Sequence, residues 1–245
     1  MNRGRRIEAV TFDCWNTLLR ERDFALPRER RATALVETAT GAGVALDATA
    51  AGDAVRAAFD RHLALWMEGI GSGANEIARW ALETAGVGDA ATRAPELARR
   101  FEDAALDGDA EPLPGAGDVL ERLRSRGVRV ALICDTGMSP GRVVRELLRR
   151  AGLLGALEVQ IFSNEVGVPK PHPRMFERAL APLGIDPARA VHIGDLRRTD
   201  VAGGRAFGMG TVRIRAAFDD TGALPDADAV IGDYTELFET LEALP

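Results

Sequence analysis

The chain has 245 residues and a net charge of −6, with 46% hydrophobic and 28% charged residues. This composition is typical of a soluble globular protein with one large domain or two smaller ones. The acidic balance argues against nucleic acid or an anionic membrane as the main partner, because both attract basic surfaces.

Targeting and cysteine signals point to the cytoplasm. The basic start, residues 1–6, is followed by a short apolar run that Asp13 interrupts, so no secretory signal is expected. No apolar run approaches the ~20 residues of a membrane span. Two cysteines and three scattered histidines do not form a disulfide framework or a zinc site. We therefore expect a reducing, cytoplasmic location.

The N-terminal stretch 9–19, Ala-Val-Thr-Phe-Asp-Cys-Trp-Asn-Thr-Leu-Leu, places an acid at the end of a buried strand. The strand is expected over residues 7–12, and Asp13 follows it. Parallel sheets collect the carboxyl ends of their strands at one edge, where α/β proteins bind ligands. Asp13 is therefore a candidate functional residue, and the alternative is an Asx-turn that serves only its own backbone.

The next block, from residue 30 to about 110, predicts helices and no strand. Apolar residues between Ala54 and Trp66 recur at the three-and-four spacing of an amphipathic helix, and residues 76–85 and 94–105 resemble it. The stretch 20–31 before this block is charged and is expected to begin with a turn or flap.

From Glu111 onward strands and helices alternate. The expected strands are 128–133, 158–162, 190–193, 211–214 and 229–231. This alternation predicts an α/β fold with a doubly wound parallel sheet. The helical block interrupts it after the first strand, so we predict a core from residues 1–19 and 111–245 and a helical cap from residues 20–110.

Polar groups gather where the predicted strands end. They are Asp13 with Thr17, the segment Cys134-Asp135-Thr136, Lys170, and Asp195 with Asp200. Carboxylates beside one ammonium suit Mg²⁺, which prefers hard oxygen ligands. Asp13 can then act as a nucleophile that forms an aspartyl-phosphate, and Lys170 can neutralise the phosphoryl oxygens. Lys170 is the single lysine among 31 basic residues, which favours a site that needs a compact ammonium. The alternative for Asp195 and Asp200 is that they cap the helix that follows them.

Four segments resemble the motifs of the haloacid dehalogenase-like hydrolase superfamily, which consists mostly of phosphatases. They are residues 12–18, 133–137, 168–173 and 192–203. The position of the helical insertion is similar to that of the branch with a helical cap after the first motif. The resemblance implies a Rossmann-like core and a small phosphorylated substrate. It also implies Mg²⁺ bound by Asp13, Asp195, the backbone carbonyl of Trp15 and, less firmly, Asp200, and phosphate bound by Thr17, Cys134, Asp135, Thr136 and Lys170.

Two residues depart from the phosphatases of that superfamily. Trp15 stands where they have a second Asp, the general acid/base, and Cys134 stands where they have a hydroxyl residue. Thr136 or backbone N–H groups are the candidates to replace that hydroxyl. Without a proton donor, hydrolysis should favour good leaving groups, such as aryl or acyl phosphates.

Two other functions stay open. The superfamily's 2-haloacid dehalogenases also carry an aromatic residue in place of the second Asp, and their halide leaving group needs no proton. They work without metal, however, and resemble Ser and Asn where this chain has Gly194 and Asp195, so the fourth motif favours phosphate. The other alternative is a non-catalytic member that binds a phosphorylated ligand or a partner protein. Monomer and homodimer are both compatible with the sequence.

Overall fold

The computed structural model describes residues 7–244, so the basic residues 1–6 lie outside it. The chain divides into two compact units, which we describe separately. The first contains residues 7–20, 110–135 and 148–244, and the second contains residues 21–109 and 136–147. No helix in the described part is long and apolar enough to cross a membrane.

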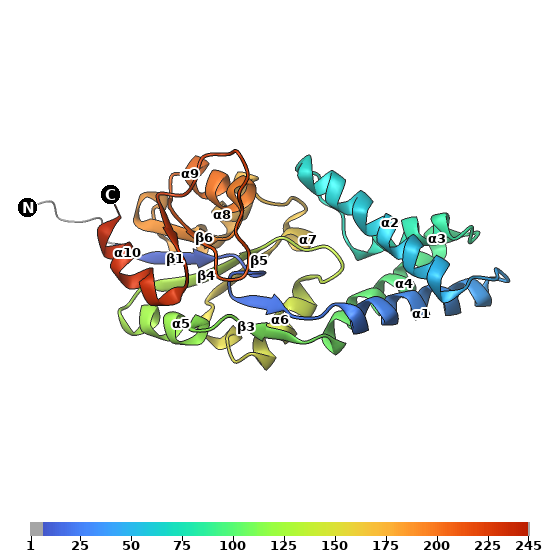
Figure 1. The fold of residues 1–245 in the computed structure, drawn as a ribbon. Coiled ribbons are helices and arrows are strands. Elements are labelled where there is room, and N and C mark those ends of the chain that lie inside the picture. The colour runs from blue at the N-terminus through green and yellow to red at the C-terminus, as the bar shows by residue number, and fades with distance from the viewer. Residues whose placement is uncertain (1–6, 245) are drawn as a thin grey trace, which may run out of the picture. The chain divides into compact units, whose positions relative to one another are not determined.

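A six-stranded parallel sheet organises the first unit, with the order β5-β4-β1-β6-β7-β8 (Figure 1). The strands are β1 Ala9–Phe12, β4 Arg129–Cys134, β5 Val159–Phe162, β6 Ala190–Gly194, β7 Gly210–Ile214 and β8 Ala229–Ile231. The direction of winding reverses at β1, and doubly wound sheets bind ligands outside the carboxyl ends of the strands at such a point. The predicted α/β fold with a doubly wound parallel sheet is confirmed.

Helices cover both faces of this sheet (Figure 1). They are α5 Ala116–Ser125, α7 Ser163–Val166, α8 Pro173–Leu180, α9 Ala202–Ala206 and α10 Leu237–Ala243, and α6 Gly141–Arg150 runs from the second unit into the first. On one face, Ala9 of β1 packs in a cluster with Met175 and Phe176 of α8. Alternate strand residues share a face, so Thr11 lies on this side as well. On the opposite face, Phe12 meets the ring of Tyr234 edge-on at 6.3 Å between centroids.

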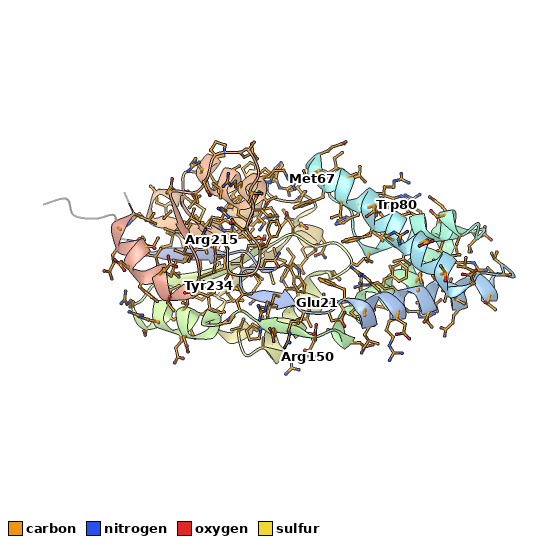
Figure 2. The ribbon with its side chains drawn as sticks, in the orientation of Figure 1. Glu21, Met67, Trp80, Arg150, Arg215 and Tyr234 are labelled. Atoms are coloured by element: carbon orange, nitrogen blue, oxygen red, sulfur yellow. The ribbon has the colours of Figure 1, made fainter. Side chains whose placement is uncertain are left out.

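Four helices form the core of the second unit, and each packs on the next, with the last returning to the first. They are α1 Ala25–Gly41, α2 Ala48–Met67, α3 Ala74–Thr84 and α4 Ala90–Asp103. Leu35, Ile77 and Phe101 are fully buried in their shared apolar core. Trp80, labelled in Figure 2, belongs to the same core. Residues 136–147 were expected in the α/β core but group with this helical unit, and Met138 packs in its apolar core.

The stretch 20–31, whose start is expected to be a turn or flap, holds the end of a short strand, a bend at Arg22 and the first residues of α1. Helix α1 begins at Ala25, and its N-cap residue Phe24 makes no side-chain capping hydrogen bond. A helix without a polar N-cap has no start signal in the sequence. Before it, the chain passes through β2 Leu19–Glu21, which pairs in a two-stranded sheet with β3 Ala110–Pro112.

Candidate active site

Asp13 is held at the carboxyl end of the central strand β1. Its backbone N–H donates to the Ile193 carbonyl at 2.8 Å, which extends the β1–β6 ladder by one residue. A tight turn follows, in which the N–H groups of Leu18 and Leu19 both donate to the Cys14 carbonyl, at 2.8 and 2.9 Å. Asp13 as a residue is 8% exposed, so its carboxylate lies in a largely buried position.

Lys170 lies between two carboxylates. Its Nζ donates to Asp13 Oδ1 at 2.5 Å and to Asp200 Oδ1 at 2.6 Å, and the residue is 1% exposed. Its backbone N–H donates to Asp135 Oδ1 at 2.9 Å, so the residue after β4 anchors the segment that carries the ammonium. Burial alone would lower the pKa of Lys170, but Asp13, Asp200 and Asp135 raise it well above its ordinary value. The ammonium is therefore charged at neutral pH.

Asp200 uses both carboxylate oxygens for hydrogen bonds. Oδ1 accepts from Lys170 and lies 3.1 Å from His192 Nε2, and Oδ2 accepts from the Leu196 N–H at 3.0 Å and the Thr199 hydroxyl at 3.3 Å. The residue belongs to a π-helical turn, Arg197–Val201, a geometry often found at functional sites. Burial would raise the pKa of Asp200, but Lys170 and the hydrogen bonds hold it well below the usual range. This carboxylate is therefore ionised, and both of its oxygens are engaged by hydrogen-bond donors.

Asp195 completes a group of three buried carboxylates. One oxygen each of Asp13, Asp195 and Asp200 lie within 4.8 Å of one another. Asp195 accepts a hydrogen bond from Asn16 Nδ2 at 3.2 Å. Burial, together with the charges of Asp13 and Asp200, raises the pKa of Asp195 to about 8. Burial likewise raises the pKa of Asp13 to about 7, in spite of Lys170.

This donor set fits a divalent cation. Three carboxylates face one ammonium, so the ionised cluster carries excess negative charge that a cation would neutralise. All the side-chain groups are hard oxygen ligands, as Mg²⁺ prefers. Because Asp200 already accepts four hydrogen bonds, Asp13 and Asp195 are the side chains better placed to bind an ion.

Thr17 is a buried residue of the turn that follows Asp13. Its carbonyl accepts a hydrogen bond from the Tyr234 hydroxyl at 2.9 Å. Its own Oγ1 is buried and has no partner among the residues that the structure describes. Tyr234 (labelled in Figure 2) packs in the core with Phe12, and its hydroxyl also holds the turn after Asp13.

The remaining predicted residues lie along the first two motifs. Trp15 is half-buried, and its backbone forms an isolated bridge with Leu19. The buried Cys134 thiol donates to the carbonyl of Asp135 at 3.3 Å. Thr136 is buried as well and belongs to the second unit. The structure therefore brings Asp13, Lys170, Asp195 and Asp200 into one cluster, and Asp135 supports it by accepting a hydrogen bond from the Lys170 backbone N–H.

Two residues of the cluster were not singled out from the sequence. They are His192, whose Nε2 lies 3.1 Å from Asp200, and Asn16, whose amide donates to Asp195. For His192, the available signal in the sequence was a polar residue within an otherwise apolar strand. For Asn16 it was an asparagine in a tight turn, where its backbone adopts the left-handed φ of 57°.

Residues 7–208 match the family model described as haloacid dehalogenase-like hydrolase. The chain belongs to this family of hydrolases. It is 30% identical over 214 residues to the haloacid dehalogenase-like hydrolase domain-containing protein 3 of Bos taurus, a match that covers 83% of this chain and 80% of the relative. It is 34% identical over 193 residues to a phosphoserine phosphatase of Thermus thermophilus, covering 71% and 72%.

Solved structures agree with the fold. A 2-haloacid dehalogenase from Pseudomonas syringae pv. tomato DC3000 superposes with a TM-score of 0.66 at 23% identity, covering 96% of this chain and 98% of that one. At this identity the likeness concerns the fold alone. The chemistry of this haloacid dehalogenase-like hydrolase must therefore be argued from its site.

Proposed function

We propose that this protein is a Mg²⁺-dependent phosphohydrolase that acts on a small phosphorylated metabolite through an aspartyl-phosphate at Asp13. The observation that carries the proposal is Asp195, a buried carboxylate 3.2 Å from an amide donor and within 4.8 Å of two other carboxylates. Such an acid is costly to keep ionised without a cation. The phosphatase name of the Thermus relative supports a phosphorylated small molecule as the substrate.

In this proposal each residue of the cluster has a distinct task. A carboxylate oxygen of Asp13 attacks phosphorus, and the bond from phosphorus to the leaving oxygen breaks with its electron pair on that oxygen. Water then hydrolyses the aspartyl-phosphate, which releases inorganic phosphate and restores Asp13. Lys170 stabilises the charge on the phosphoryl oxygens, and Asp200 holds Lys170 in place. Thr17, Asp135, Thr136 and the backbone around Cys134 are assigned to phosphate binding.

Asp13, Asp195 and the backbone carbonyl of Trp15 would hold the Mg²⁺ ion. When bound, this ion supplies positive charge for the phosphate oxygens and orients the phosphate. The fit rests on the excess of carboxylates over cationic groups in the cluster.

Trp15 sets the substrate preference in this proposal. An indole cannot protonate a departing alkoxide or activate water, and general acid/base catalysis is worth on the order of 10²–10⁴-fold. We therefore assign the enzyme a preference for good leaving groups, such as aryl or acyl phosphates. We assign residues 20–110 the role of a cap that selects the substrate. The free, buried Cys14 and Cys134 support a reducing, cytoplasmic location.

Dehalogenation is the second candidate because Trp15 suits a leaving group that needs no proton. Asp195 argues against it, since a haloacid brings its own carboxylate into a cluster that is already negative. A non-catalytic binding protein is the third candidate. The intact contact between Asp13 and Lys170 argues against that one.

The deciding experiment measures phosphate release from an aryl phosphate and chloride release from 2-chloropropionate, each with Mg²⁺ and with EDTA. We expect Mg²⁺-dependent phosphate release that is lost in Asp13→Asn and strongly reduced in Asp195→Asn. Chloride release that persists in EDTA would establish the dehalogenase alternative. Neither product, with Mg²⁺ binding intact, would favour the binding protein.

A further inference from the structure

A buried chain of hydrogen bonds leads from β1 to the Lys170 ammonium. Thr11 of β1 and His192 of β6 are register partners on neighbouring strands, with Thr11 Oγ1 2.7 Å from His192 Nδ1. His192 Nε2 lies 3.1 Å from Asp200 Oδ1, the same oxygen that accepts from Lys170. Thr11, His192, Asp200 and Lys170 are at most 2% exposed. Each therefore depends on its neighbour, and not on bulk water, for its hydrogen bond.

The ionised Asp200 limits the direction of these bonds. A carboxylate only accepts, so the hydrogen bond to Asp200 forms only when His192 Nε2 carries a proton. Burial and the nearby Lys170 ammonium lower the pKa of His192, whereas its hydrogen bonds to Asp200 and Thr11 raise it. In a neutral imidazole the other nitrogen, Nδ1, is an acceptor, and the Thr11 hydroxyl must then donate to it.

We propose that Thr11 and His192 are positioning residues: the Thr11 hydroxyl selects the Nε2–H tautomer of His192, which fixes Asp200 and, through it, the Lys170 ammonium beside Asp13. The effect on turnover rests on the proposed phosphohydrolase function. The tautomer and the position of Lys170 do not, since these hydrogen bonds exist in the resting protein.

The competing explanation is that both residues only fill space. His192 also meets the ring of Phe176 edge-on at 5.2 Å between centroids, and Thr11 is a β-branched residue in a strand, where valine would pack equally well. Thr11→Val keeps the shape and removes the donor, whereas Thr11→Ser keeps the donor and removes a methyl group. This pair of variants therefore separates positioning from packing.

The first measurement is the ¹⁵N NMR spectrum of histidine-labelled protein at pH 7.5. The chain has three histidines, so the His192 signals are identified by their loss in His192→Gln. We expect the neutral Nε2–H tautomer in the wild-type protein and in Thr11→Ser, and a tautomer mixture in Thr11→Val. A wild-type ring that is charged or carries its proton on Nδ1 overturns the proposal, and His192→Gln is needed only to assign the signals.

The second measurement uses Lys170 as its own probe. Because it is the only lysine, ¹⁵N-lysine labelling gives a single side-chain Nζ signal. We expect Thr11→Val to shift this signal and to speed its hydrogen exchange, and Thr11→Ser to leave both unchanged. An unchanged Lys170 signal in a folded Thr11→Val protein, or an equal change in both variants, overturns the proposal.

The third measurement is turnover of an aryl phosphate. By analogy with groups that orient active-site ligands, loss of the donor should lower kcat about tenfold or more. We expect this loss in Thr11→Val with KM within about twofold of wild type, and recovery in Thr11→Ser. A full kcat in Thr11→Val contradicts the positioning role. An inactive wild-type protein would instead refute the proposed function, and the two NMR measurements would still decide this inference.

Discussion

Gly194 leaves the space that the carboxylate of Asp200 occupies. A Cβ atom on Gly194 would overlap with the side chain of Asp200, including its carboxylate carbon. Asp200 Oδ1 in turn accepts a hydrogen bond from the Lys170 ammonium, at 2.6 Å. The glycine at the end of β6 is therefore part of the machinery that positions Lys170, although it has no side chain of its own.

The first prediction concerns this close approach. Gly194→Ala should displace Asp200 and lower kcat for an aryl phosphate at least about tenfold, and overpacking should cost about 1–3 kcal/mol of unfolding free energy. The control is Gly155→Ala, because a Cβ at Gly155 meets nothing within 4 Å. Urea unfolding and steady-state kinetics on both variants check it. Wild-type kinetics in Gly194→Ala would show that Asp200 does not need its present position.

The second prediction concerns the charge of Lys170. Lys170→Met should reduce turnover by roughly 10²–10³-fold, as for other groups that stabilise a developing oxyanion. Lys170→Arg should not restore it, since a planar guanidinium cannot donate to both carboxylates from the space of a compact ammonium. Removing one partner of a buried ion pair costs about 3–5 kcal/mol, so the variant should also be less stable.

Lys170→Met leaves the negative charge of Asp200 without its partner, and the matched control removes this charge as well. Lys170→Met combined with Asp200→Asn should regain part of the lost unfolding free energy but none of the activity. Stability losses that simply add in the double variant would mean that the pair is not energetically coupled.

The third prediction concerns pH and metal. The pKa values of Asp13 and Asp195 are raised to about 7 and about 8, so the metal-free folded state holds protons that the unfolded state has already released. The stability that these groups contribute is present below pH ~4 and is lost as the pH rises through 7 to 8. With EDTA, we expect the free energy of unfolding to fall over this range, by up to about 1.4 kcal/mol per pH unit for each such carboxyl.

Mg²⁺ should oppose this loss, because it binds the deprotonated carboxylates. Asp195→Asn should flatten the pH dependence in EDTA and should abolish most of the stabilisation by Mg²⁺. Urea titrations of both proteins at pH 6 and pH 8.5, with Mg²⁺ and with EDTA, measure these effects. The difference between the two proteins removes the contribution of the other titrating groups. Identical pH dependence in the two would contradict the raised pKa of Asp195.

The fourth prediction concerns the leaving group. Because Trp15 offers no proton, the rate should fall steeply from aryl to alkyl phosphates, and Trp15→Asp should raise turnover of alkyl phosphates. Rates are compared across esters of graded leaving-group pKa, with Trp15→Asn as the control for the loss of indole volume. A flat series in the wild-type enzyme would mean that another group protonates the leaving oxygen.

The fifth prediction concerns Asn16, whose backbone has φ 57° and whose amide donates to Asp195. Asn16→Gly relieves the left-handed strain but removes that donor, so unfolding free energy should change by less than about 1 kcal/mol. Mg²⁺ should bind more weakly, because groups that orient metal ligands are worth roughly 10–100-fold in affinity. Isothermal titration calorimetry with Mg²⁺ measures this directly. Unchanged affinity would assign Asn16 to the turn alone.

The sequence by itself determined the α/β class and the edge of the sheet where Asp13, Asp135 and Asp195 follow their strands. Those conclusions rest on local patterns: an apolar run of strand length, an acid or glycine at its end, and a helical spacing after it. The local patterns were weaker at α1, which starts at Ala25 without a polar N-cap.

Only the tertiary structure decided how the carboxylates divide their tasks. Asp195 and Asp200 look alike in the sequence, but Asp200 is held by four donors and Asp195 by the amide of Asn16. Thr11 and His192 are 181 positions apart in the chain and meet because β1 and β6 pair in parallel register. Such contacts depend on strand order and register, which no stretch of neighbouring residues encodes. They determine which carboxylate oxygens of the cluster are left free of hydrogen bonds and available to a ligand.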